Sequence, residues 1–136
     1  MQTSAGYQEI AHTADWELHV WAPDMPGLLE QAARGTYALM VIRLKSSPRQ
    51  SRKFEIHFQD QESLLVSFLA ELLLVCELET LGFDTFDLQI LGNRLIANLS
   101  GAPVESIVKE IKAVTYHNLA IRDTAPGLEA NIVFDV

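Results

Sequence analysis

Two aspartates and a lysine at distant points of the sequence have the residue types of a metal or phosphate site. Asp135 ends an apolar alternating run at the C-terminus, Asp15 lies near the N-terminus, and Lys112 begins the string Lys-Ala-Val-Thr-Tyr-His. Hard divalent cations prefer carboxylate oxygens, and a lysine ammonium binds phosphate or carboxylate oxygens. If the two ends of the chain meet, these three groups would form one site for a divalent metal ion or a phosphate.

Each of these residues also has a purely structural interpretation. An aspartate at a strand end is most often a turn or cap residue, and a lysine on an edge strand protects that edge from pairing. His12 and His117 are weaker candidates, because neither stands at a metal-ligand spacing from another histidine or cysteine. His12 either orients the loop that carries Asp15 or hydrogen-bonds a backbone carbonyl.

Two further side chains have a structural default and a weaker link to the site. His117 shares the apolar face of its predicted strand, which favours a half-buried histidine. Glu71 is an acid within an apolar helical segment, where a position at the rim is the default. We keep both as weaker site candidates.

Composition limits the class of protein. The chain has 136 residues, 49% of them hydrophobic, which suits one domain over residues 1–136 with a single core. Its net charge of −8 would repel a phosphate backbone, so direct nucleic-acid binding is disfavoured and cations or basic protein surfaces are the better partners. We predict a cytoplasmic protein outside the membrane. The chain has one cysteine, it shows no signal-peptide pattern, and it has no apolar run long enough to span a membrane.

Hydrophobic periodicity predicts two helices and several strands. The first helix follows an Asp24 N-cap and runs to about residue 40, and the second, apolar around most of its circumference, spans about 61–79 with Gly82 as its stop. The predicted strands are 15–21, 53–58, 86–91, 95–99, 110–122 and 128–136. This order favours an α+β fold, with two helices packed on one largely antiparallel sheet.

The last two predicted strands form a hairpin with its turn near Ala125. That register places Asp135 opposite roughly Thr115, with Lys112 about 10 Å further along the neighbouring strand. A long lysine side chain covers much of that distance, so Lys112 and Asp135 are predicted to border one pocket.

Four segments, in this order, resemble the archease family: residues 12–15 (His-Thr-Ala-Asp), the central helix from 63 to 73, the string 111–117 (Ile-Lys-Ala-Val-Thr-Tyr-His), and the closing 134–136 (Phe-Asp-Val). The resemblance covers nearly the whole chain and implies an α+β fold. Archeases are protein cofactors of RtcB-type RNA ligases, which join RNA ends in tRNA splicing and RNA repair. They promote formation of the ligase's covalent guanylate intermediate from GTP with a divalent metal ion (Ca²⁺, Mg²⁺ or Mn²⁺), and they sustain multiple turnover.

The resemblance also implies roles for individual residues. The family's metal-linked carboxylates fall on Asp15 and Asp135, and its functional lysine falls on Lys112. The protein itself would be a non-catalytic activator, because the nucleophile belongs to the ligase. Two other functions remain open: an autonomous metal-dependent hydrolase built on the two aspartates, and a chaperone-like interaction module that works through an apolar patch.

Overall fold

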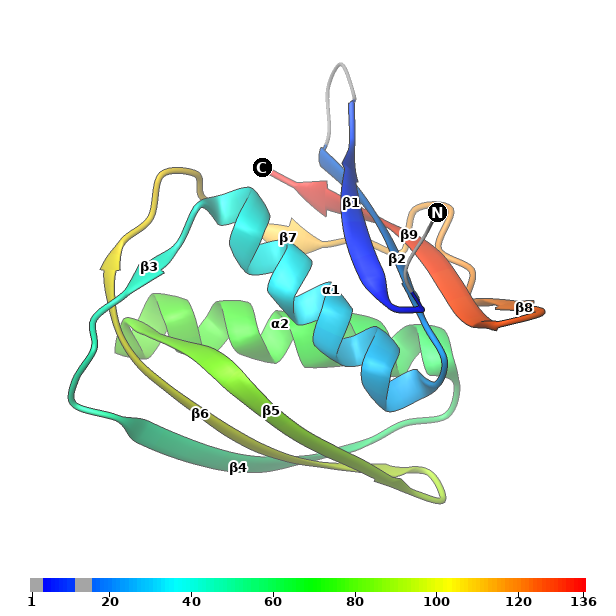
Figure 1. The fold of residues 1–136 in the computed structure, drawn as a ribbon, viewed down its shortest axis with the longest axis horizontal. Helices are drawn as coiled ribbons and strands as arrows, with labels where there is room; N and C mark the ends of the chain where they lie inside the picture. The colour runs from blue at the N-terminus through cyan, green and yellow to red at the C-terminus, as the bar shows by residue number, and fades with distance from the viewer. Residues whose placement is uncertain (1–3, 12–15) are drawn as a thin grey trace.

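Two helices and two antiparallel sheets make up the computed structural model, which describes residues 4–11 and 16–136 (Figure 1). The first sheet has the order β1 (Gly6–Ile10), β2 (Trp16–Ala22), β9 (Gly127–Asp135) and β7 (Ala113–Val114), and β8 (Arg122–Thr124) pairs with the other end of β9. The second sheet contains β3 (Arg43–Leu44), β4 (Gln50–His57), β5 (Leu81–Leu91) and β6 (Arg94–Ser106). Both helices contact strands of both sheets.

The two helices begin where their caps predict. Asp24 precedes α1 (Met25–Met40), and its carboxylate accepts a hydrogen bond from the Gly27 N–H at 2.8 Å. Asp60 caps α2 (Gln61–Glu79) in the same way, accepting from the Ser63 N–H at 2.7 Å. The predicted stop at Gly82 is wrong: Thr80 adopts the left-handed conformation that ends α2, and Gly82 already lies in β5.

The core lies where α2 crosses the middle of the molecule (Figure 1). One side of α2 is fully buried against α1 and both sheets, with its largest side chains at 0% exposure: Leu64, Leu65, Phe68, Leu69 and Leu72. Burying side chains of this size stabilises a fold by about 1.5–3 kcal/mol each. None of the helices in the described residues is long and apolar enough to cross a membrane.

The α+β class with two helices is confirmed, but the strands divide between two sheets rather than one. The hairpin turn at Gly92-Asn93 is present, with strands of 11 and 13 residues that are much longer than predicted. Strands β1 and β3 were not predicted, and β4 begins at Gln50, three residues before the strand that was predicted at 53–58. The second sheet is built around β6, which pairs along its length with β3, β4 and β5.

The predicted long strand at 110–122 is wrong. Within it, pairing is limited to Ala113–Val114 and to Arg122, the first residue of β8. Between them the chain turns: Asn118 has a positive φ of 54°, and the Leu119 N–H donates to the Tyr116 carbonyl at 3.0 Å. The Ile121 N–H then bonds a side chain of α2 instead of a neighbouring strand.

Candidate functional site

The end of β9 places Asp135 beside Lys112. Ala113 is the register partner of Asp135, and the Lys112 N–H donates to the Asp135 carbonyl at 2.8 Å. The two residues are therefore joined through their backbones at one end of the first sheet. The predicted partner, Thr115, is two positions away, but the predicted neighbourhood of Lys112 and Asp135 is present.

Buried neighbours direct both side chains outward. Phe134 is 0% exposed and Ile111 is 8% exposed, so both are fixed in the core. The residues that follow them, Asp135 and Lys112, are both exposed. The β7–β9 contact is held further by Thr115, whose N–H and hydroxyl both donate to the Val133 carbonyl at 3.0 Å.

Asp15 and His12 lie outside the described residues. Trp16, which follows Asp15 in the sequence, is the first described residue of β2 and pairs with Phe134, the residue before Asp135. The chain positions next to the two aspartates thus form one strand pair. Carboxylate oxygens are the donors that a hard divalent cation prefers, and Asp135 is the described member of the expected donor set.

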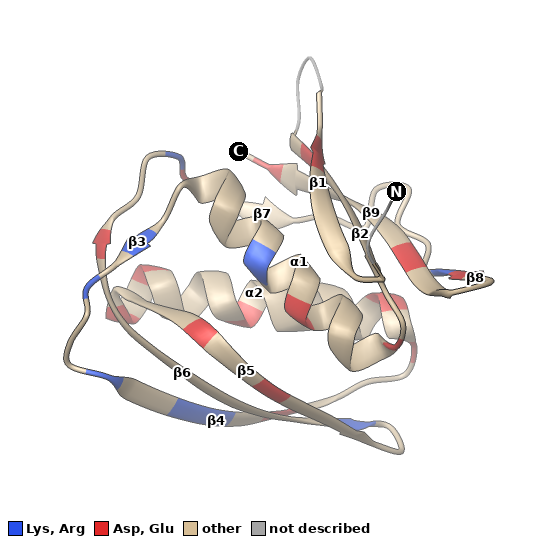
Figure 2. Ribbon diagram, in the orientation of Figure 1, with Lys and Arg blue, Asp and Glu red and all other residues tan. Residues whose placement is uncertain are grey.

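A second lysine lies near this end of the sheet and was not predicted. The Lys109 ammonium stands 4.9 Å from the ring centroid of Trp16, in cation–π geometry. Only the tertiary fold brings the two together, so no spacing in the sequence indicates the contact. Figure 2 shows the acidic end of β9 in red.

The weaker candidates Glu71 and His117 are not brought into one cluster with Asp135. Glu71 is half-buried on α2. His117 is exposed in the turn after β7, where its ring Nε2 lies 3.3 Å from Asn118 Nδ2, so its predicted place on an apolar strand face is wrong. Across residues 4–11 and 16–136, no group of three histidine, cysteine, aspartate or glutamate residues is arranged to hold a metal ion.

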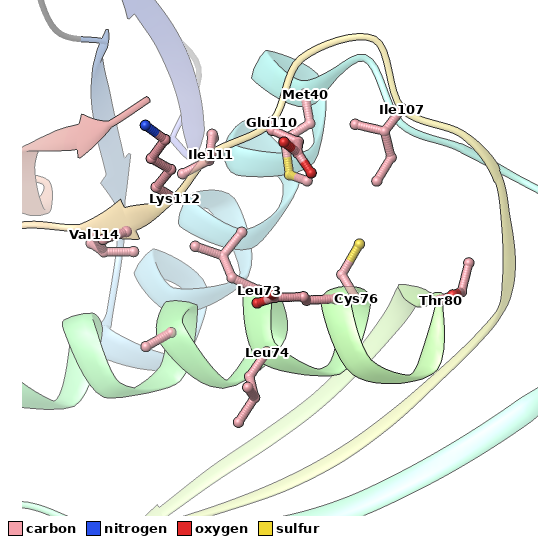
Figure 3. Close-up of a pocket in the computed structure, with 13 residues that line it drawn as sticks. Met40, Leu73, Leu74, Cys76, Thr80, Ile107, Glu110, Ile111, Lys112 and Val114 are labelled. Carbon is pink, nitrogen blue, oxygen red and sulfur yellow. The ribbon is translucent and has the colours of Figure 1, made fainter.

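A groove of about 710 Å³ opens between α2 and the segment 107–114, and Lys112 forms part of its wall (Figure 3). Most of its lining is aliphatic or sulfur-containing: Met40, Ala70, Leu73, Leu74, Cys76, Ile107, Ile111, Ala113 and Val114. Burial raises the pKa of the Cys76 thiol, which keeps it protonated and unsuited to nucleophilic chemistry.

Comparison with known proteins places the chain in one protein family. The model of the Archease protein family (MTH1598/TM1083) matches residues 7–136. The chain is 31% identical to the protein archease of Methanosarcina barkeri, over 96% of this chain and 95% of that protein. It is 32% identical to the protein archease of Thermococcus gammatolerans, over 89% of this chain and 91% of that protein.

Solved structures show the same fold. The solution structure of protein 1598 of Methanobacterium thermoautotrophicum matches with a TM-score of 0.75 and 25% identity, covering 96% of this chain and 99% of that one. A crystal structure from Thermotoga maritima, described as an archease and possible chaperone, matches with a TM-score of 0.73 and 22% identity, covering 95% and 96% of the two chains.

Proposed function

Because the chain belongs to the archease family, we propose that it is a protein cofactor of an RtcB-type RNA ligase, which it helps to charge with guanylate from GTP. The main observation behind this proposal is the backbone hydrogen bond that joins Lys112 to Asp135 at the end of the first sheet. Asp135 and Lys112 are fixed by a backbone hydrogen bond and by buried neighbours, while both side chains remain exposed. An acid and a base held rigidly at a protruding strand end suit insertion into a partner's active site.

Asp135 and Asp15 are the residues that would hold a divalent metal ion. Two carboxylates give the site a charge of −2, and backbone carbonyls or water molecules can complete the shell of Ca²⁺, Mg²⁺ or Mn²⁺. Bound there, the ion supplies neutralisation of phosphate charge. Lys112 contributes a positive charge that binds a GTP phosphate oxygen or a carboxylate of the ligase.

In this mechanism the nucleophile is the ligase's active-site histidine, and the present chain acts as an activator. Phosphoryl-type transfer depends mainly on positioning and charge stabilisation, which a carboxylate and an ammonium on a rigid strand end can provide. The net charge of −8 accords with a protein that binds a basic protein surface rather than RNA. The single cysteine accords with activity in the reducing cytoplasm.

A second function, a chaperone-like interaction module, is supported by a different observation. The groove beside α2 is apolar and open, and the related Thermotoga maritima protein is described as a possible chaperone. That function would rest on apolar contact alone and would survive loss of Asp135, Lys112 and metal. The hydrolase alternative gains no support from the described residues, where no metal-ligand cluster occurs.

Multiple-turnover RNA ligation distinguishes these functions. The cognate ligase is mixed with excess RNA ends, GTP and Mn²⁺ or Mg²⁺, with this protein at substoichiometric amounts. We expect the protein to raise the number of products per ligase well above one, and Lys112→Ala or Asp135→Ala to abolish the gain. Full activity of both variants would remove the proposed site and would favour the interaction module, whose binding to the ligase should also survive metal chelation.

A further inference from the structure

Helix α2 has an apolar face that the fold leaves uncovered. One side of the helix is fully buried, but Leu74 is 46% exposed and Leu78 is 72% exposed. A helix that is apolar around its whole circumference is normally buried on all sides. Across from it, Ile107 and Val108 are 36% and 68% exposed. Leu74 and Ile107, from two separate segments, line one groove, so these two exposures belong to a single surface feature.

Leu74, on α2, and Ile107, on the segment 107–114, both line the groove between these two elements. Its volume of about 710 Å³ falls within the range of roughly 300–1,000 Å³ typical of binding pockets. In Figure 3, Cys76 projects from α2 toward the gap below Met40, while the Lys112 side chain is directed away from Leu73 and Cys76. Most residues that line the groove are thus apolar, and its two acids, Glu77 and Glu110, are exposed to solvent.

The wall opposite α2 is held in place by the fold. The Val108 and Lys109 N–H groups both donate to the Met40 carbonyl at 3.1 Å, which fixes the segment to the end of α1. The Lys109 side chain rests over Trp16, and the Lys112 N–H is bonded to Asp135. A groove formed in advance binds with a smaller ordering cost than one that must open.

The charged residues that line the groove indicate which kind of segment would bind there. Glu77 and Glu110 both line it and are exposed, whereas Lys112 is the one lysine or arginine in the lining. An acidic rim around an apolar floor is complementary to an apolar segment that carries lysine or arginine. A second copy of this chain, with a net charge of −8, would bring like charges to the rim and is disfavoured.

We propose that this groove docks an apolar segment of the partner ligase that carries at least one lysine or arginine. The inference rests on the proposed function and adds a second contact to it. Lys112 belongs both to the groove wall and to the strand end with Asp135, so docking in the groove fixes the position of the acting carboxylate. The groove supplies affinity, and Asp135 supplies activation.

Titration of guanylylation separates the two roles. Initial rates of ligase labelling from GTP are measured as the concentration of this protein rises, for wild type, Leu74→Glu and Glu77→Lys. We expect each variant to need at least about tenfold more protein for half-maximal stimulation, because Leu74→Glu removes an apolar contact and Glu77→Lys replaces attraction to a basic segment with repulsion. The same plateau should be reached at saturation. Asp135→Ala should lower the plateau instead.

Matched controls exclude a general effect of surface charge. Leu91→Glu changes a leucine of similar exposure, 52%, at the hairpin end of β5, and Asp87→Lys reverses an exposed acid on the same strand. Neither residue lines the groove, so both controls should titrate like wild type. Glutamate and leucine have similar helix propensity, so Leu74→Glu should retain its helical circular dichroism.

Three outcomes would overturn the inference. Unchanged half-maximal concentrations for Leu74→Glu and Glu77→Lys would mean that the groove does not meet the ligase. Equal weakening by Leu91→Glu would show that the effect is not specific to this surface. Concentration-dependent dimers that Leu74→Glu dissociates would identify a second copy as the occupant. Absence of any stimulation by wild type is a separate result, because it contradicts the proposed function itself.

Discussion

Two adjacent residues at the end of β9 are predicted to have opposite roles, one in stability and one in activity. Phe134 is 0% exposed and forms part of the core, whereas Asp135 is exposed and bonded to the rest of the fold through its backbone carbonyl. Phe134→Ala should therefore destabilise the fold, and Asp135→Ala should leave it intact. The comparison separates the anchor of the strand from the group that acts.

The size of the Phe134 effect follows from its burial. Replacing a fully buried phenylalanine with alanine costs about 3–5 kcal/mol, from lost transfer free energy and the cavity that remains. At an unfolding entropy of about 2.1 cal/mol/K per residue, the 136 residues give roughly 0.29 kcal/mol/K. The melting midpoint of Phe134→Ala should then fall by about 10–17 °C. Asp135→Ala, an exposed substitution, should change the free energy of unfolding by less than about 0.5 kcal/mol.

Urea unfolding and thermal melts, followed by circular dichroism, measure both variants against wild type. The expected result is a large loss for Phe134→Ala and overlapping curves for wild type and Asp135→Ala. A loss below about 1 kcal/mol for Phe134→Ala would refute the packing of the strand end, since even the removal of single buried methylenes costs about that much. A large loss for Asp135→Ala would mean that its carboxylate is structural.

Two further perturbations test contacts that hold the site and the sheets. Glu62→Ala removes the carboxylate that accepts a hydrogen bond from the Ile121 N–H at 2.9 Å. It should lower the free energy of unfolding, measured by urea titration, by about 1–3 kcal/mol. An unchanged free energy of unfolding would show that this bond does not hold the turn after β7. The hydrogen bonds from Arg49 lower the pKa of the Asp84 carboxyl in the folded state. The pair therefore stabilises the fold at pH values above the unfolded-state pKa of about 4, and this stabilisation is lost as the pH falls through the folded-state pKa. Arg49→Ala should therefore flatten the acid limb of stability against pH. The effect should be small because both side chains are nearly half exposed, and a wild-type acid limb in the variant would contradict this assignment.

The helices could be predicted from the sequence because their signals are local. The side chains of Asp24 and Asp60 bond N–H groups three residues away, and the apolar spacing that follows each cap lies within one segment. The strand pattern is less informative. Residues 110–122 alternate in polarity, yet Asn118 turns the chain and Glu62, distant in sequence, takes the Ile121 N–H. Partners that are distant in the sequence cannot be predicted from the alternation of polar and apolar residues within one segment.

The neighbourhood of the site could be predicted, but not its detail. A simple hairpin brought Lys112 and Asp135 together, because the last strand does run back along the segment before it. The observed partner of Asp135, Ala113, lies two positions from Thr115 and so within the approximate register that was predicted. The offset arises because the intervening chain turns instead of pairing throughout. The groove could not be predicted, because its walls come from α2 and from an irregular segment at 107–112, whose last three residues the alternation wrongly assigned to a strand.

Guanylylation of the ligase tests the central claim most directly. The cognate RtcB-type ligase is incubated with labelled GTP and Mn²⁺ or Mg²⁺, alone, with substoichiometric wild-type protein, or with the Asp135→Ala variant at the same concentration. The account predicts faster transfer of label to the ligase with wild type and no acceleration with the variant, whose folding is verified by its melting curve. Acceleration that is equal for wild type and Asp135→Ala, or absent with wild type while the ligase is active, would contradict it.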